Sequence, residues 1–195
     1  MPLVATFHPP FDAGLRNITA GTQQLTYQLY APALARYDRV IVFSQLQADV
    51  LVRLGVPEQR LVVIPNGVDT ECWAPATPGT SNLTLKRVRE QLGSQRIFLY
   101  MGRLATEKNV EALLRAWRLT SPVGCRLVIV GDGPLCSGLM NQFGNGEVLW
   151  WGYEPDLETR VALLQCAEVF VLPSLVEGLS LALLEAMASG TACVA

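Results

Sequence analysis

The chain has 195 residues, of which 50% are hydrophobic and 16% are charged, and its formal net charge is −2. This composition supports a substantial apolar core and argues against a disordered chain. Because Lys and Arg form no dense run, the sequence also argues against a nucleic-acid-binding groove. The first residues lack the basic and apolar parts of a secretory signal, and no apolar run approaches the roughly 20 residues of a membrane span. We therefore predict a cytoplasmic protein.

Short apolar segments alternate along the chain with amphipathic ones. The predicted strands are 3–7, 39–43, 61–64, Arg96–Met101, 126–130, 148–151, 169–172 and a last start at Ala192. Their apolar character is continuous, which is typical of parallel strands covered on both faces. Helical spacing predicts helices at 45–54, 109–119, from Pro155 to about Gln165, and 180–189. This alternation predicts an α/β fold with parallel sheets and helices on both faces.

Residues 65–80 interrupt this alternation with turn dipeptides, three prolines and no periodicity. Such a composition indicates a linker between two parts of the chain. We expect the first part at 1–68, the linker and a helix leading out of it at 69–95, and the second part at 96–195. The strand that starts at Ala192 has no helix after it, so we expect both parts to be incomplete.

The stretch G-R-L-A-T-E-K-N runs from Gly102 to Asn109, directly after a predicted strand. A helix that begins near Lys108 would turn its free N–H groups and its positive dipole end toward this loop. Open α/β sheets bind ligands at the carboxyl ends of their strands, where Arg103 and Lys108 would lie. The two cations therefore indicate a diphosphate site, although two solvated basic residues in a surface loop are the alternative.

A second strand-end motif, V-G-D-G-P-L-C, contains the first half of a dinucleotide-binding fingerprint in Gly131 and Gly133. Cys136 occupies the place of the third glycine, which that fold needs for close packing of helix on strand. We interpret the motif as a tight turn whose glycines let a ligand or backbone approach. A nicotinamide-dependent enzyme is a weaker alternative.

Two further candidates also follow predicted strands. The segment W-W-G-Y ends at Tyr153, whose ring could stack on a nucleobase or simply cover the core. His8, the single histidine, follows the first strand. One histidine cannot form a two-histidine zinc site, and no G-x-S-x-G nucleophile motif is present. We therefore predict no metal site.

The stretch E-G-L-S-L-A-L-L-E begins at Glu177 and ends at Glu185. Because Leu-Pro-Ser ends a strand just before it, Glu177 should lie in a loop ahead of the helix, with Glu185 about two turns inside. The N–H groups near Leu179 and Ser180 would then open toward an anion. Alternatively, Glu185 is an ordinary exposed residue, and Glu177 merely favours the positive end of the helix dipole.

Together these segments resemble the large family of retaining glycosyltransferases with the GT-B fold, glycosyltransferase family 4, also called group 1. The matching motifs are P-N-G-V-D at 65–69, G-R-x₄-K at 102–108, V-G-D-G-P at 130–134, W-G-Y at 151–153 and E-G-L-S-L-A-L-L-E-A-M-A-S-G at 177–190. They occur in the family order over roughly residues 36–195. The resemblance implies an amino-terminal acceptor domain, of which 1–68 is the carboxyl half, and a truncated donor-binding domain at 96–195, both Rossmann-like.

The resemblance also implies a nucleotide-diphosphate sugar as the donor of a hexosyl group, transferred with retention to a saccharide, a lipid-linked or a small-molecule acceptor. Arg103 and Lys108 would grip the diphosphate, and Gly102, Gly131 and Gly133 would lie in the same site. Enzymes of this family generally need no metal and no cofactor, and no D-x-D motif is present. Parts outside this sequence could bring peripheral membrane contact.

For the sugar and the nucleoside, the resemblance implies a second group of residues. Glu177 would hold hydroxyls of the donor sugar, and backbone amides of Gly178, Leu179 and Ser180 would face the same ligand. Glu185 would bind the ribose hydroxyls. Tyr153 would lie near the base, and His8 would approach the reacting centre from the amino-terminal domain. A non-catalytic nucleotide-binding remnant or partner module remains the alternative.

Overall fold

The computed structural model describes residues 1–7, 22–77, 79, 82–120, 122–144, 146, 148–175, 177 and 179–195. These residues form two compact units. The first unit consists of Met1–Gly67 and the loop Val176–Ser180, and the second consists of Val68–Leu175 and Leu181–Ala195. Both belong to the predicted α/β class, because each unit contains a parallel sheet with helices packed on it.

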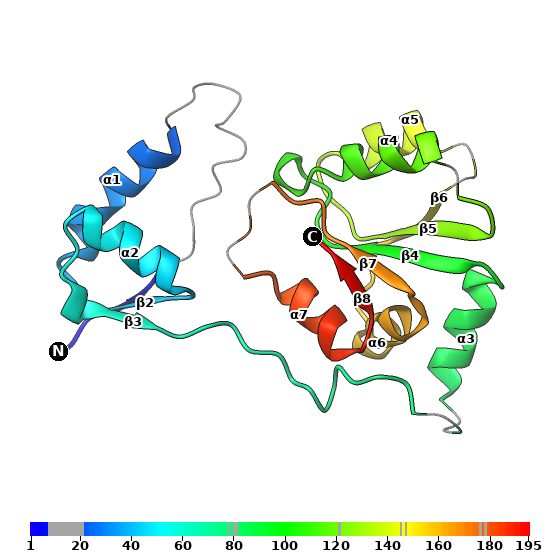
Figure 1. The fold of residues 1–195 in the computed structure, drawn as a ribbon, viewed down its shortest axis with the longest axis horizontal. Helices are drawn as coiled ribbons and strands as arrows, with labels where there is room; N and C mark the ends of the chain where they lie inside the picture. The colour runs from blue at the N-terminus through cyan, green and yellow to red at the C-terminus, as the bar shows by residue number, and fades with distance from the viewer. Residues whose placement is uncertain are drawn as a thin grey trace. The chain divides into compact units, whose positions relative to one another are not determined.

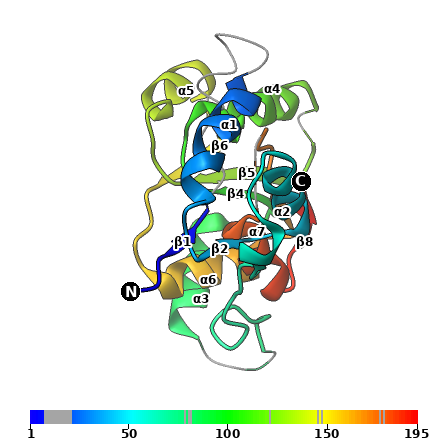
Figure 2. The same cartoon turned by 90° about the vertical axis from the view of Figure 1, so that its left-hand side faces the viewer.

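The first unit contains a three-stranded parallel sheet in the order β1-β2-β3. Its elements are β1 (Val4–Thr6), α1 (Thr22–Leu34), β2 (Arg39–Val42), α2 (Gln45–Arg53) and β3 (Leu61–Val63). Strands that advance in one direction through right-handed crossovers place both connecting helices on one side of the sheet. Figures 1 and 2 show α1 and α2 on the same side of these strands.

The core of the first unit lies between this sheet and its helices. Val40 and Val42 of β2 and Leu51 of α2 are completely buried. Helix α2 begins after Ser44, whose side chain accepts a hydrogen bond from the backbone N–H of Gln47 at 3.3 Å. The outer strands are more open, and Val4 of β1 is 57% exposed.

The second unit contains a five-stranded parallel sheet in the order β6-β5-β4-β7-β8. Its elements are α3 (Leu83–Leu92), β4 (Arg96–Met101), α4 (Val110–Thr120), β5 (Cys125–Val130), α5 (Cys136–Phe143), β6 (Val148–Gly152), α6 (Leu157–Cys166), β7 (Val169–Val171), α7 (Leu181–Ala188) and β8 (Ala192–Val194). The chain builds outward from β4 to β6 and then returns to the other side of β4. This reversal makes the sheet doubly wound and places a switch point between β4 and β7.

The reversal also distributes the helices over both faces of the sheet. Figure 1 shows α4 and α5 above the sheet, and α3, α6 and α7 below it. Successive residues of β4 point to opposite faces of the sheet. Leu99 therefore belongs to the core between the sheet and helices α3 and α6, whereas Tyr100 belongs to the core between the sheet and helices α4 and α5. Two apolar layers therefore cover the two faces of the central strands.

The segment that the sequence predicts as a linker packs on the second unit over much of its length. Trp73 is 5% exposed and lies in the core under α3 and α6. Its backbone N–H donates to the carbonyl oxygen of Asp69 at 2.9 Å. The side-chain amide of Gln165 in α6 donates to the carbonyl oxygen of Ala74 at 2.8 Å. Residues 69–76 are therefore irregular in conformation but fixed in place.

The eight predicted strands are confirmed, and so are the four predicted helices, with ends that differ by a few residues. Helix α3 occupies the place where the sequence predicts a helix at the end of the linker. Helices α1 and α5 are not predicted, because α1 contains Pro32 and α5 contains Gly138, both poor residues for a helix interior.

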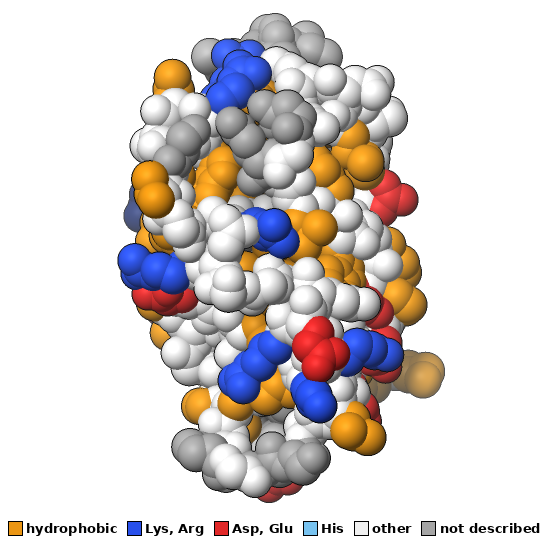
Figure 3. Space-filling model, turned by 90° about the vertical axis from the view of Figure 1, so that its right-hand side faces the viewer, with side chains coloured by type: hydrophobic (Ala, Val, Ile, Leu, Met, Phe, Trp, Pro, Cys, Tyr) orange, Lys and Arg blue, Asp and Glu red, His pale blue; other side chains and the backbone are white. Residues whose placement is uncertain are grey.

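The surface of the protein mixes both signs of charge on the face that Figure 3 shows, where Lys and Arg side chains lie among acidic and apolar ones. None of the five cysteines forms a disulfide, and each is partly buried. Within the described ranges, no helix is both long and apolar enough to cross a membrane.

Candidate functional site

A cavity of about 590 Å³ opens at the carboxyl ends of β4, β5 and β6 in the second unit. It is lined by the last residues of β4 and β5, by the loops that follow the three strands and by one residue of α6: Met101, Gly102, Arg103, Val130, Gly131, Asp132, Gly133, Tyr153, Glu154, Pro155 and Arg160. Five predicted site residues, Gly102, Arg103, Gly131, Gly133 and Tyr153, thus lie around one cavity. The position agrees with the expectation that open α/β sheets bind ligands beyond the carboxyl ends of their strands.

The two glycines after β5 allow the loop after β4 to pack against them. A Cβ atom on Gly131 would collide with the carbonyl oxygen of Gly102, and one on Gly133 would collide with that of Leu104. Gly131 also has a φ of +128°, which L-residues rarely adopt. Hydrogen bonds join the same loops, from Gly102 N to Val130 O and from Leu104 N to Asp132 O, each 2.9 Å long. The glycines are therefore needed for backbone packing, which is one of the two roles that the sequence predicts.

Arg103 lies at the rim of the cavity on a loop that a buried tyrosine supports. The hydroxyl of Tyr100, which is completely buried, donates to the carbonyl oxygen of Arg103 at 2.7 Å. The Arg103 side chain itself is exposed. The backbone around this cation is thus anchored from below, while its guanidinium can reach a ligand.

Lys108 ends a short 3₁₀ turn, Thr106–Lys108, directly before α4. The next residue, Asn109, is the one non-glycine residue of the described chain with a positive φ, at 51°. Asn adopts this left-handed conformation more readily than other residues with a side chain, which explains why Asn can stand here. The backbone N–H of Leu175, after β7, donates to the carbonyl oxygen of Glu107 at 3.0 Å. The Lys108 turn therefore lies at the switch point between β4 and β7.

The third wall of the cavity follows β6. Tyr153 is 73% exposed, so its ring is open to solvent. Glu154 accepts a hydrogen bond from the indole N–H of Trp151 at 3.0 Å and another from the backbone N–H of Asp156 at 2.9 Å. Asp156 in turn caps α6 by accepting from the N–H of Thr159 at 2.9 Å. These bonds fix the turn between β6 and α6 beside the cavity.

Glu185 is half-buried in α7, and burial raises the pKa of its carboxyl, while the charge of Arg160 partly offsets this rise. Arg160 in α6 is thus a cation whose charge affects the Glu185 carboxyl in α7. Arg160 also lies over the ring of Trp73, with its guanidinium carbon 5.6 Å from the ring centroid. Arg160 thus lines the cavity, whereas Glu185 is not among the lining residues.

The loop with the remaining predicted residues belongs to the first unit. The side-chain amide of Asn66 donates to the carbonyl oxygen of Leu179 at 2.9 Å, and Asn66 belongs to the P-N-G-V-D motif. Glu177 is exposed, whereas Leu179 and Ser180 are partly buried. The predicted residues His8 and Gly178 lie outside the described residues.

Three charged lining residues, Asp132, Glu154 and Arg160, are not among the predicted site residues. Asp132 lies inside the V-G-D-G-P motif, and Glu154 directly follows Tyr153, so both could have been found by considering every charged residue at these strand ends. Arg160 is four residues after Asp156 in a helix, and only the packing of α6 against the strand ends brings it to the cavity.

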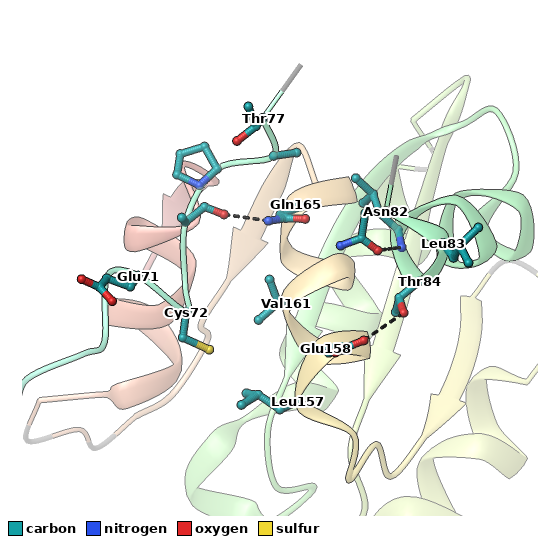
Figure 4. A pocket seen from close by; sticks show the side chains of 14 residues that line it. Glu71, Cys72, Thr77, Asn82, Leu83, Thr84, Leu157, Glu158, Val161 and Gln165 are labelled. Atoms are coloured by element: carbon teal, nitrogen blue, oxygen red, sulfur yellow. Dashed lines mark hydrogen bonds between the residues drawn. The ribbon is translucent and has the colours of Figure 1, made fainter. Parts of the chain in front are cut away.

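A second cavity, of about 770 Å³, lies between the segment 71–77, the start of α3 and α6. Figure 4 shows its walls, in which Gln165 reaches the backbone of this segment and Thr84 faces Glu158. The Thr84 hydroxyl donates to Glu158 at 3.2 Å, and Asn82 caps α3 through the N–H of Leu85 at 2.9 Å. These polar groups thus bind one another, and no predicted site residue lines this cavity. Among the residues that the structure describes, no three His, Cys, Asp or Glu side chains gather as metal ligands would.

Two family models match the chain. The model for glycosyl transferases group 1 matches residues 95–195, and the model for glycosyltransferase family 4 matches residues 1–72. The chain is 29% identical to the alpha-monoglucosyldiacylglycerol synthase of Streptococcus pneumoniae, over 100% of this chain and 46% of that protein. It is 30% identical to the alpha-maltose-1-phosphate synthase of Mycolicibacterium smegmatis, over 100% of this chain and 53% of that protein.

Solved structures show the same fold. Anabaena HepE in complex with UDP and glucose matches with a TM-score of 0.75 and 19% identity, over 98% of this chain and 52% of that one. Sucrose-phosphate synthase from Thermosynechococcus elongatus matches with a TM-score of 0.73 and 25% identity, over 97% of this chain and 49% of that one. The chain spans about half the length of the relatives it matches. It belongs to the group 1 glycosyl transferases of glycosyltransferase family 4, and its two parallel-sheet units have the GT-B type of fold.

Proposed function

We propose that this chain is the donor-binding part of a glycosyltransferase that transfers a hexosyl group from a nucleotide-diphosphate sugar to an acceptor. The cavity at the ends of β4, β5 and β6, with Arg103 at its rim, is the observation that carries this proposal. Membership of the family supports it, as do the solved complexes of Anabaena HepE with UDP and with UDP-glucose.

The diphosphate is assigned to the loops after β4 and β5. Arg103 supplies a planar fork of donors to phosphate oxygens, and Lys108 adds a point charge at the start of α4. Gly102, Gly131 and Gly133 let the ligand approach the backbone of these loops. When the sugar leaves, negative charge grows on the diphosphate, so cations held ready beside it lower the barrier.

The sugar and the nucleoside are assigned to the other predicted residues. Glu177 accepts hydrogen bonds from hydroxyls of the donor sugar, with backbone amides of Gly178, Leu179 and Ser180 on the same ligand. Glu185 accepts from the ribose hydroxyls. Tyr153 is assigned to the base, and His8 to the sugar near the reacting carbon.

Three further properties complete the proposal. The anomeric configuration is retained, no metal ion takes part because the cations above neutralise the leaving group, and the protein works in the cytoplasm. The acceptor is a saccharide, a lipid-linked or a small molecule, and the first unit contributes to its site. NMR of the product measures the anomeric configuration, and assays with and without EDTA test the need for a metal.

The test combines binding with turnover. Calorimetry with UDP, GDP and ADP measures nucleotide affinity, and release of nucleoside diphosphate from UDP-glucose or GDP-mannose measures turnover. Glu177→Ala should abolish turnover while the chain stays folded, which circular dichroism checks. Glu58→Ala, which removes an exposed acid elsewhere in the first unit, is the control and should leave turnover unchanged. Wild-type turnover in Glu177→Ala would contradict the assignment.

The second candidate function is nucleotide binding without catalysis, as a remnant or partner module. The chain spans about half the length of the relatives it matches and contains the donor cavity, so nucleotide binding can be tested in it separately from turnover. Comparing the 195-residue chain with a form extended at both ends along its gene separates the two. Binding by both with turnover only by the longer form favours the module, whereas equal turnover by both rules it out.

A further inference from the structure

Arg160 lines the cavity from helix α6, whereas every other lining residue lies at the end of a strand or in the loop after it. Its Nε atom is buried and has no hydrogen-bond partner among the described residues. A buried donor without a partner costs free energy, commonly about 1–3 kcal/mol and more for a charged group. Because the Arg160 residue also lines the cavity, a ligand there can accept hydrogen bonds from its guanidinium and offset part of this cost.

The surroundings of Arg160 hold its guanidinium without using all its donors. The ring of Trp73 lies beneath it, 5.6 Å from centroid to guanidinium carbon, and Trp73 is itself fixed in the core. Glu185 interacts with it electrostatically from α7. A guanidinium has five N–H donors in one plane, so donors remain for a ligand after these contacts. The side chain is thus oriented before any ligand binds, which reduces the entropy cost of binding.

We propose that Arg160 is a specificity-determining residue that donates hydrogen bonds to the nucleoside half of the donor. This inference rests on the proposed function, because it assumes a nucleotide in the cavity. Arg160 shares a wall with Tyr153 and Pro155, after β6, and it neighbours Glu185, whereas Arg103 and Lys108 follow β4. With the base assigned to Tyr153 and the ribose to Glu185, Arg160 lies on the nucleoside side of the proposed site. Acceptor oxygens of the base or ribose are the partners that its donors fit.

The experiment measures the affinities of the 195-residue chain for UDP, GDP and ADP by calorimetry. Arg160→Gln should lower the affinity for the nucleotide that the wild-type chain binds most tightly about tenfold or more, because hydrogen bonds to charged groups are worth at least that factor. The affinities for the three nucleotides should therefore become more similar. Arg103→Gln, which changes a residue assigned to the diphosphate, should lower the affinities for UDP, GDP and ADP by a similar factor, so the ratios between these affinities should stay as in the wild type. Arg118→Gln is the matched control, because that guanidinium lies over Phe143 on α5 and not in the cavity.

Each outcome decides the inference. A folded Arg160→Gln chain with the wild-type ratio of affinities overturns it, and so does a wild-type chain that binds all three nucleotides equally. If Arg160→Gln unfolds too easily to be titrated, Arg160→Lys decides instead, because it keeps the charge and loses the planar fork. In Arg160→Lys, the ratio of the affinity for the preferred nucleotide to the affinities for the other two should fall. The wild-type ratio in this variant would refute the inference. A wild-type chain that binds none of the three overturns the proposed function together with the inference.

Discussion

Glu185 lies in a helix whose other residues are Leu, Ala and Met, and it is half-buried there. Burial raises the pKa of its carboxyl because the ionised form loses solvation, and the charge of Arg160 restores only part of that loss. A half-buried carboxylate is an unfavourable choice for stability alone. Such a cost is typical of groups kept for binding, which agrees with the ribose contact proposed for Glu185.

The sign of its effect on stability follows from linkage. The folded pKa lies above the unfolded value, so the folded chain is favoured at low pH and loses that advantage as pH rises through the folded pKa. Glu185→Gln removes this titration. The melting temperature of Glu185→Gln relative to wild type should therefore be higher at pH 7.5 than at pH 4.5, while affinity for nucleoside diphosphate falls. Scanning calorimetry at both pH values measures the first effect, and titration measures the second.

The control for this substitution is Glu90→Gln in α3, where the side chain is exposed. Its melting temperature should differ from wild type by the same small amount at both pH values. If Glu185→Gln behaves in the same way, the carboxyl does not carry a burial cost in the folded chain.

At the scale of elements, the turn after β5 packs closely on the turn after β4 at Gly131. A methyl group there would meet the carbonyl oxygen of Gly102, and the positive φ adds backbone strain. Gly131→Ala should therefore lower the free energy of unfolding by about 2 kcal/mol or more. Gly138→Ala in α5 is the matched control, because nothing lies within 4 Å of its added methyl group. It should raise stability by about 0.5–1 kcal/mol.

Urea unfolding of the two variants measures both changes. Because the turns carry the cavity walls, Gly131→Ala should also weaken nucleoside diphosphate binding, whereas Gly138→Ala should not. Equal stabilities of the two alanine variants would show that the turns can move apart at little cost.

The elements that the sequence predicts well are those whose signal is local. Each strand is a continuous apolar run, and the helix at Asn109 has apolar residues at clear helical spacing, so both are visible without the fold. Helices α1 and α5 form against poor local sequence, because Pro32 and Gly138 are outweighed by packing in the tertiary structure.

The same distinction applies to the site. Residues at strand ends, such as Arg103 and Tyr153, are predicted because parallel strands bring their carboxyl ends together. Arg160 is not, because its place in the cavity depends on how α6 crosses the sheet. Trp73 likewise stands in a segment rich in turn residues, and only the structure shows it in the core.

For the whole molecule, the described chain has separate cores in its two units. The first unit has three strands with both of its helices on one side, whereas the second has five strands covered on both faces. A smaller core buries less apolar surface, so the first unit should be the less stable one. Unfolding should therefore not be a single two-state transition.

The distribution of tryptophans lets one experiment separate the units. All four tryptophans, Trp73, Trp117, Trp150 and Trp151, belong to the second unit, whereas helices of both units contribute to circular dichroism. On heating, ellipticity at 222 nm should begin to fall before tryptophan fluorescence changes. Saturating nucleoside diphosphate should raise the fluorescence transition by several degrees and leave the early ellipticity change in place, because the ligand stabilises the unit that binds it. Coincident transitions that shift together would instead mean that the two cores unfold as one, with the ligand held by both.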